Sequence, residues 1–160
     1  MRMLVIPSTT LGRFVFLPRR TVFGPEGSLN SMIDYVRQRA IDVLRSVTTA
    51  VLATHGPAGI LASRQLCEAV GLHLYLLLPQ TSDHLFNLEE DGRVALVTDE
   101  WDLRGLGHAL SPEGLPPELE HLKEYVKEWH VLVKVLPTQI QVRRREGWGP
   151  IETIDLPALE

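Results

Sequence analysis

Cysteine is almost absent from this sequence: Cys67 stands alone among 160 residues, so no intrachain disulfide can form. Basic residues are also fewer than acidic ones, since the chain has 16 Lys and Arg and 20 Asp and Glu. The resulting net charge of -4 gives no reason to expect nucleic acid or an anionic membrane as a partner. No apolar run approaches the roughly 20 residues of a membrane span. The apolar run at residues 3–6 ends at Pro7, too soon for a signal peptide. We therefore expect a protein of the reducing cytoplasm.

The hydrophobic content is sufficient for a single packed domain. Apolar residues make up 44% of the chain, an ordinary value for a globular protein of this length. Residues 1–27 show no clear periodicity, and we expect them to form an N-terminal arm. Residues 28–160 are then one domain.

Most of the structural signal lies between residues 48 and 110. An apolar, β-branched run over residues 48–54 is followed by a Gly/Pro turn, a return strand over 60–70, a turn at Gly71 and a strand over 72–78. A short helix begins near Thr81, and strands over 93–98 and 101–110 follow it. Antiparallel neighbours with one inserted helix predict a small β-barrel. The start of that helix is the obvious place for an anion, because its free N–H groups and dipole attract negative charge.

Two further helices are expected outside this region. Apolar residues recur at three- and four-residue intervals from Leu29 through Ile33 to Val47, which predicts a helix over residues 29–45 that covers one end of the barrel. A second helix is expected from Pro116 onward, with Trp129 at the end of its buried stripe.

Two segments carry a resemblance to a known family. They are TTAVLATHGPAGILAS (residues 48–63) and LHLYLLLPQTSDHLFNLEEDGRVALVTDEWDLRGLGHA (residues 72–109). Both resemble the pyridoxamine 5′-phosphate oxidase-like family, the FMN-binding split barrels. The resemblance implies a mainly β fold, an antiparallel split barrel with peripheral helices. It also implies a homodimer with FMN in the groove between its two copies, acting as an oxidoreductase on a small organic substrate.

The family holds the flavin phosphate with a Ser-Arg-Lys sequence at the start of the inserted helix, and here the matching residues are Ser82, Asp83 and His84. Thr81 and Ser82 are implied cofactor contacts. Asp83 at about 5 Å would repel a phosphate by roughly 3 kcal/mol at an effective dielectric near 20. Its alternative role is that of a first-turn carboxylate, which stabilises a helix without any ligand. His84 is either a weaker substitute for the family's cation or an exposed surface histidine.

The second strand supplies Ser63, Arg64 and Gln65. Side chains alternate along a strand, so Ser63 and Gln65 share one face and Arg64 takes the other. The resemblance implies that Arg64 contacts the phosphate or the ring edge, and that Ser63 or Gln65 bonds the isoalloxazine. The alternative for Arg64 is an ion pair with Glu68.

Two more contacts follow from the resemblance. The family often has polar residues at the end of the next strand, where Leu78 leaves only its backbone for such a contact. Asp102 lies on the fifth strand, whose family counterparts often reach the partner subunit's cofactor. No residue is identifiable as a general base, and the histidines show no metal-ligand spacing.

Two other functions remain open from the sequence. One is a cofactor-free barrel that has lost its flavin affinity and serves as a binding or regulatory module. The other is a haem-binding barrel that uses a histidine as axial ligand. The basic residues Arg143 and Arg144 near Trp148 either reach a ligand or form a solvated strand end.

Overall fold

Antiparallel strands are the largest component of the computed structural model, which describes residues 25–144 and 146–156. The expected arm lies outside these residues, except for positions 25–27, which already belong to a helix. The elements in chain order are α1 (Pro25–Leu44), β1 (Thr49–Gly56), β2 (Gly59–Val70), β3 (His73–Pro79), α2 (Asp83–Glu90), β4 (Arg93–Val97), β5 (Trp101–Ala109), two 3-10 turns (Pro112–Gly114 and Pro117–Leu122), α3 (Lys123–Glu128), β6 (His130–Arg143) and β7 (Pro150–Asp155).

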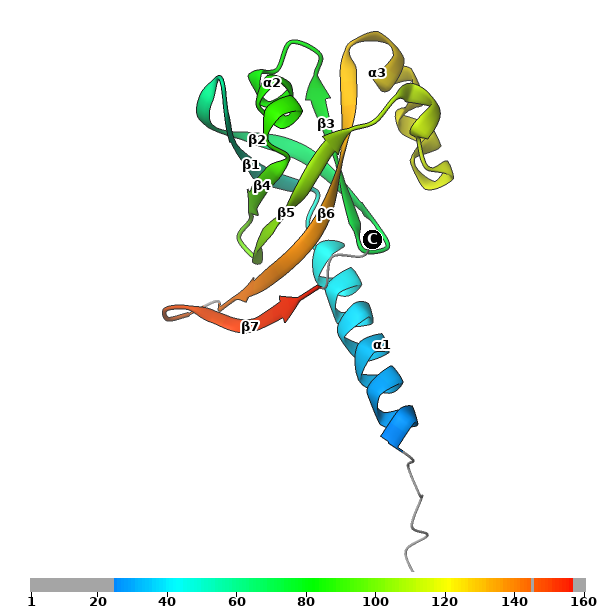
Figure 1. Cartoon of the computed structure of the whole chain (residues 1–160), viewed down its shortest axis with the longest axis vertical. Helices are drawn as coiled ribbons and strands as arrows, with labels where there is room; N and C mark the ends of the chain where they lie inside the picture. Colours follow the sequence, from blue (N-terminus) through cyan, green and yellow to red (C-terminus); the bar gives the residue numbers. More distant parts are fainter. Residues whose placement is uncertain (1–24, 145, 157–160) are drawn as a thin grey trace, which may run out of the picture.

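The strands close into a barrel. Within the part of the chain described, they form one antiparallel sheet in the order β3-β2-β1-β4-β5-β6-β7, and an additional pairing of β3 with β6 joins the first six into a ring (Figure 1). Strand β7 extends β6 beyond the ring. The predicted mainly β, antiparallel split barrel with peripheral helices is therefore confirmed.

Strand β3 is central, as its two apolar faces predict. It pairs with β2 on one side and with β6 on the other. Leu74, Leu76 and Leu78 are fully buried in the main core. Tyr75, on the opposite face, packs in a second cluster under the 3-10 turns and α3.

Helix α1 has the predicted position in the chain, but only part of its apolar face is buried. Ala40 and Leu44 in its last turns are fully buried, whereas Leu29 and Ile33 are 63% and 57% exposed. A helix of 20 residues is about 30 Å long, so its first turns extend past the barrel, as Figure 1 shows. The expectation that this whole face covers a barrel end is wrong for the first turns. No helix among the described residues is long and apolar enough to cross a bilayer.

The region after β5 differs from expectation at Trp129. Trp129 is 71% exposed because α3 ends at Glu128, so it does not continue the buried stripe. At Pro137 the strand β6 continues, but the register of the β5–β6 ladder shifts opposite it, between Arg104 and Gly105. Such a bulge accommodates a residue that cannot donate to the ladder.

Candidate functional site

The two faces of β2 separate the expected site residues into two groups. Ser63 and Gln65 pair with Leu52 and Ala50 of β1, whose side chains are buried, so both point to the inward face near α2. Arg64 points to the outer face. The predicted alternation is confirmed. Because of this alternation, the residues of β2 and α2 that were expected to form one site do not all lie close together.

The inward group is centred on His84, which is only 5% exposed. Its Nδ1 lies 2.8 Å from Thr54 Oγ1, and its Nε2 lies 2.7 Å from Ser63 Oγ. Gln65 Nε2 donates to the same Ser63 oxygen at 2.8 Å. The interpretation of His84 as an exposed surface histidine is therefore wrong. Two hydroxyl groups engage both of its ring nitrogens, a pattern that a neutral imidazole satisfies with one donor and one acceptor.

Asn87 completes this buried network, one helical turn after His84. It is fully buried, and its Nδ2 donates to Thr54 Oγ1 at 3.1 Å and to the carbonyl of Gly59 at 2.9 Å. Its Oδ1 accepts from the N–H of Ala58 at 2.9 Å. Together these bonds fasten α2 to the β1–β2 hairpin. The sequence analysis missed Thr54 and Asn87. One signal for this network was present in the sequence, because Thr54 is a polar residue at a position of β1 whose side chain points inward.

Burial also determines the charge of His84. Desolvation lowers the pKa of His84, and the nearby carboxylate of Asp83 opposes this shift only in part. A buried, neutral ring with both nitrogens engaged does not fit the role of a substitute cation for a phosphate. Burial likewise raises the pKa of the Cys67 thiol to about 11, which fits a core residue and not a nucleophile.

The start of α2 offers hydroxyl groups but also a negative charge. Ser82 is the N-cap residue, yet its side chain makes no capping hydrogen bond. Thr81 is exposed beside it. Asp83 is exposed and pairs with no cation in the described part of the chain. These hydroxyls are available to a ligand, and the carboxylate opposes an anionic one.

The outer group lies along a single row across the sheet. From β2 to β6, Arg64 pairs with Val51, Val51 with Val97, Val97 with Asp102, and Asp102 with Gln141. Arg64 and Asp102 therefore share one face and are three strand spacings, about 14 Å, apart. The adjacent row contains Ala62, Ala53 and Ala95, so the surface between the two charged residues is apolar.

The charged ends of this row differ in their pairing. The side chain of Arg64 is exposed and makes no ion pair or hydrogen bond with the residues described, while Glu68 contacts His121 Nε2 at 3.0 Å. The alternative pairing of Arg64 with Glu68 is therefore wrong. Asp102 is bound by Arg143, whose Nη2 lies 2.9 Å from its Oδ1. A shallow pocket of about 210 Å³ opens between β4, β5 and β6 on this face and includes Asp102 in its lining.

Leu78 joins neither group. Its side chain is fully buried in the core, and its backbone pairs with Val131 of β6. No cluster of three or more His, Cys, Asp or Glu among the described residues is arranged to hold a metal ion.

The chain is similar to known proteins in its fold. No family model matches the chain, and no curated protein matches its sequence. General Stress Protein 26 from Bacillus anthracis str. Sterne superposes with a TM-score of 0.58 at 17% identity, covering 74% of this chain and 98% of that one. A putative pyridoxamine 5′-phosphate oxidase from Listeria innocua gives 0.52 at 14% identity, covering 67% and 97%. A heme binding protein from Mycobacterium smegmatis gives 0.54 at 17% identity, covering 72% and 57%.

These neighbours define the class of the protein. Its architecture is that of the pyridoxamine 5′-phosphate oxidase-like split barrels, as the two sequence segments indicate. At these identities the similarity concerns the fold alone, and the ligand has to be argued from this chain's own residues.

Proposed function

We propose that the protein is a homodimer that binds FMN in a groove between the outer faces of its two barrels. The observation that carries this proposal is the row from Arg64 to Asp102 across one apolar outer face. A twofold axis parallel to the strands and through the middle of the row brings Arg64 of one copy opposite Asp102 of the other. The two ends are then complementary in charge, and each groove receives residues from both copies.

The residues available in that groove suit a planar ligand that carries a phosphate. Arg64 supplies a guanidinium without a competing partner in the described chain, and such a group bonds phosphate oxygens in a forked geometry. The Ser63–His84 hydrogen bond holds the start of α2, with the hydroxyls of Thr81 and Ser82, beside the strand segment that bears Arg64. Val51 and the alanines of the adjacent row provide an apolar floor for a ring.

Bound FMN would supply hydride or electron transfer to a small organic substrate, while the protein orients it and limits its contact with water. Asp83 works against this binding, because its exposed carboxylate lies at the helix start where the family has a cation. At an effective dielectric near 20 the repulsion lowers the affinity by up to about a hundredfold. We therefore propose a weakly held flavin.

Titration of FMN into the purified protein, followed by quenching of flavin fluorescence, tests the proposal. Wild type should bind, and Arg64→Gln should bind at least about tenfold more weakly, since it loses a charge-assisted hydrogen bond. Arg37→Gln, an exposed arginine of α1, is the matched control and should bind like wild type. Equal affinity of wild type and Arg64→Gln would place any flavin elsewhere.

A cofactor-free binding module is the second candidate, favoured by the neutral, buried His84 and the unpaired Asp83. The same titration separates the two, because such a module takes up no FMN. A Soret band in the absorption spectrum of the purified protein would instead identify the haem-binding alternative.

A further inference from the structure

An apolar groove lies between α1 and the end of β7. Its volume is about 330 Å³, and its apolar lining consists of Met32, Ile33, Val36, Leu72 and Leu156. The floor is continuous with the main core, because Val36, Leu72 and Leu156 pack against that core. The α1 wall is uncovered, since Met32 and Ile33 are 62% and 57% exposed. Exposed apolar surface that adjoins a core is typical of a site that another segment covers.

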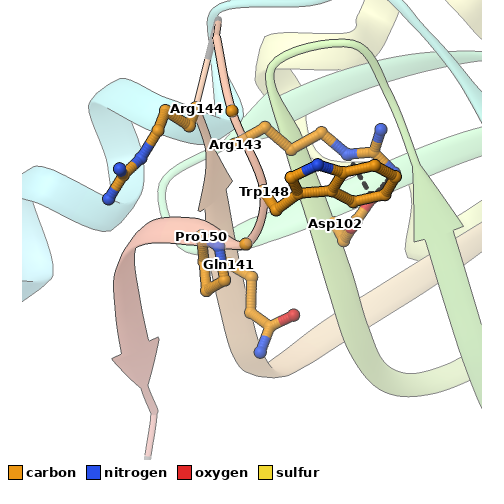
Figure 2. A pocket seen from close by; sticks show the side chains of 8 residues that line it. Asp102, Gln141, Arg143, Arg144, Trp148 and Pro150 are labelled. Carbon is orange, nitrogen blue, oxygen red and sulfur yellow. Dashed lines mark hydrogen bonds and ion pairs between the residues drawn. The ribbon is translucent and has the colours of Figure 1, made fainter.

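Strand β7 has a free edge beside this groove. Among the described strands it pairs with β6 alone. Its position is nevertheless fixed, because Arg39 Nε of α1 donates to Glu152 at 3.0 Å. Figure 2 shows the turn that leads into β7 at Pro150, where Arg143 forms an ion pair with Asp102. A fixed strand with an open edge is a template on which a further strand can add.

The sequence Phe-Val-Phe-Leu at residues 14–17 has the side chains that suit this groove. A cavity of about 150 Å³ holds one benzene ring, so the groove has room for two. In an extended segment Phe14 and Phe16 lie on the same face and can enter it together. Aromatic and β-branched residues favour strands, and Pro18 favours an extended conformation at the residue before it.

The chain between this segment and α1 is long enough. Helix α1 begins at Pro25, and Ile33 lies about 12 Å further along the helix. Seven residues separate Leu17 from Pro25, and when extended they span roughly 23 Å, sufficient to turn back and reach the groove. Residues 157–160 begin beside the groove but contain a single large apolar side chain, Leu159. They therefore offer less than the two rings that the groove can hold.

The charges of the two parts are complementary. Residues 1–24 contain four arginines and no acidic residue, and since the whole chain has a net charge of -4, residues 25–160 carry -8. Asp155 lines the groove, accepts a hydrogen bond from Gln139 Nε2 at 2.8 Å and forms no ion pair with a described residue. Arg37 also lines the groove, so the incoming arginines are expected on the Asp155 side.

We propose that residues 14–17 fold back onto the same chain and pair with the free edge of β7, with Phe14 and Phe16 in the groove. The added strand extends the core over the first turns of α1. It also covers a sheet edge that would otherwise be open to pairing with other chains. The contact uses neither Arg64 nor Asp102, so it is independent of the proposed flavin groove.

A cysteine pair in the full-length chain tests where the segment lies. Under mild oxidation Phe16→Cys with Ile33→Cys should form a disulfide within one chain, detected by mass spectrometry. Cys67 does not compete, because it is buried and burial raises the pKa of its thiol to about 11. The control pair, Ile6→Cys with Ile33→Cys, should react at least about tenfold more slowly, since residue 6 has no fixed position near the groove. Equal rates, or a disulfide that joins two chains, would overturn the proposal.

Hydrogen exchange tests the pairing with β7. The double variant Phe14→Ser with Phe16→Ser should exchange the amides of residues 150–155 at least about tenfold faster than wild type, because the added strand is lost. Leu4→Ser with Ile6→Ser removes two apolar side chains from the same part of the chain and should exchange like wild type. Unchanged exchange in the first variant, or equal acceleration in both, would refute the added strand. Protection that rises with protein concentration would assign the edge to a second copy of the chain and not to residues 14–17.

Discussion

Two adjacent residues of β2, Ser63 and Arg64, lie in opposite environments. The environment of Ser63 stabilises the fold, whereas that of Arg64 is available for binding a ligand. Ser63 points inward to a buried network in which the polar groups of His84 and Asn87 have partners. Arg64, the next residue, points outward to an apolar face and has no partner in the described chain. A buried polar group without a partner costs stability, so the inward side must be satisfied. An exposed arginine loses little by remaining unpaired, which leaves it available to a ligand.

The largest effect is expected on the inward side. Asn87→Ala removes three hydrogen bonds from a fully buried site and should lower the free energy of unfolding by about 3 kcal/mol. Urea denaturation measures the loss. Arg64→Gln, on the outer side of the same region, should change stability by less than about 0.5 kcal/mol. Similar losses in both variants would contradict the contrast between the two faces.

The next effect concerns the proposed dimer. Val97 lies in the middle of the outer row, so Val97→Lys places a charge where the two copies meet and should raise the dimer dissociation constant by about thirtyfold or more, roughly 2 kcal/mol. Sedimentation velocity over a concentration series measures the constant. Tyr125→Lys, at an exposed position of α3, should leave it unchanged. A wild-type protein that is monomeric at every concentration would refute the dimer.

A smaller effect should appear as a dependence of stability on pH. Burial lowers the pKa of His84 in the folded protein, so the unfolded chain binds the proton more readily as the pH falls below its ordinary pKa. Stability is therefore complete above that pKa and decreases on acidification, by at most about 1.4 kcal/mol per pH unit for one group. His84→Gln should reduce this slope in thermal unfolding between neutral and mildly acidic pH. The lowered pKa of His73 acts in the same direction and leaves a residual slope.

The smallest effect is expected at the helix start. Asp83→Asn removes an exposed carboxylate and should tighten FMN binding about threefold to tenfold, because solvent screens much of the repulsion. Flavin fluorescence titration measures the change. Glu90→Gln, at the opposite end of α2, removes the same charge and should have little effect. If both variants bind alike, the position of the charge is irrelevant and the helix start is not near the phosphate.

Local patterns predicted strands β1 to β5 and the helix between β3 and β4. The strand predicted over residues 72–78 is β3 in the structure, and it pairs with both β2 and β6. The surroundings of His84 were not predictable in the same way, because its contacts Thr54 and Ser63 lie 30 and 21 residues away in the chain. The exposure of Leu29 was missed for a related reason, since a helical period shows which side is apolar and not how far the neighbouring surface extends.

The amino-acid sequence by itself determined strands β1 to β5, the helix between β3 and β4 and which residues of β2 share a face, because these follow from side-chain periodicity and turn chemistry between near neighbours. The split-barrel class followed from the resemblance of two sequence segments to a known family. Only the tertiary structure decided that His84 is buried and neutral, that Arg64 and Asp102 lie in one row, and that Asp102 pairs with Arg143. Those facts depend on strand register and on desolvation, both of which arise when distant segments pack together.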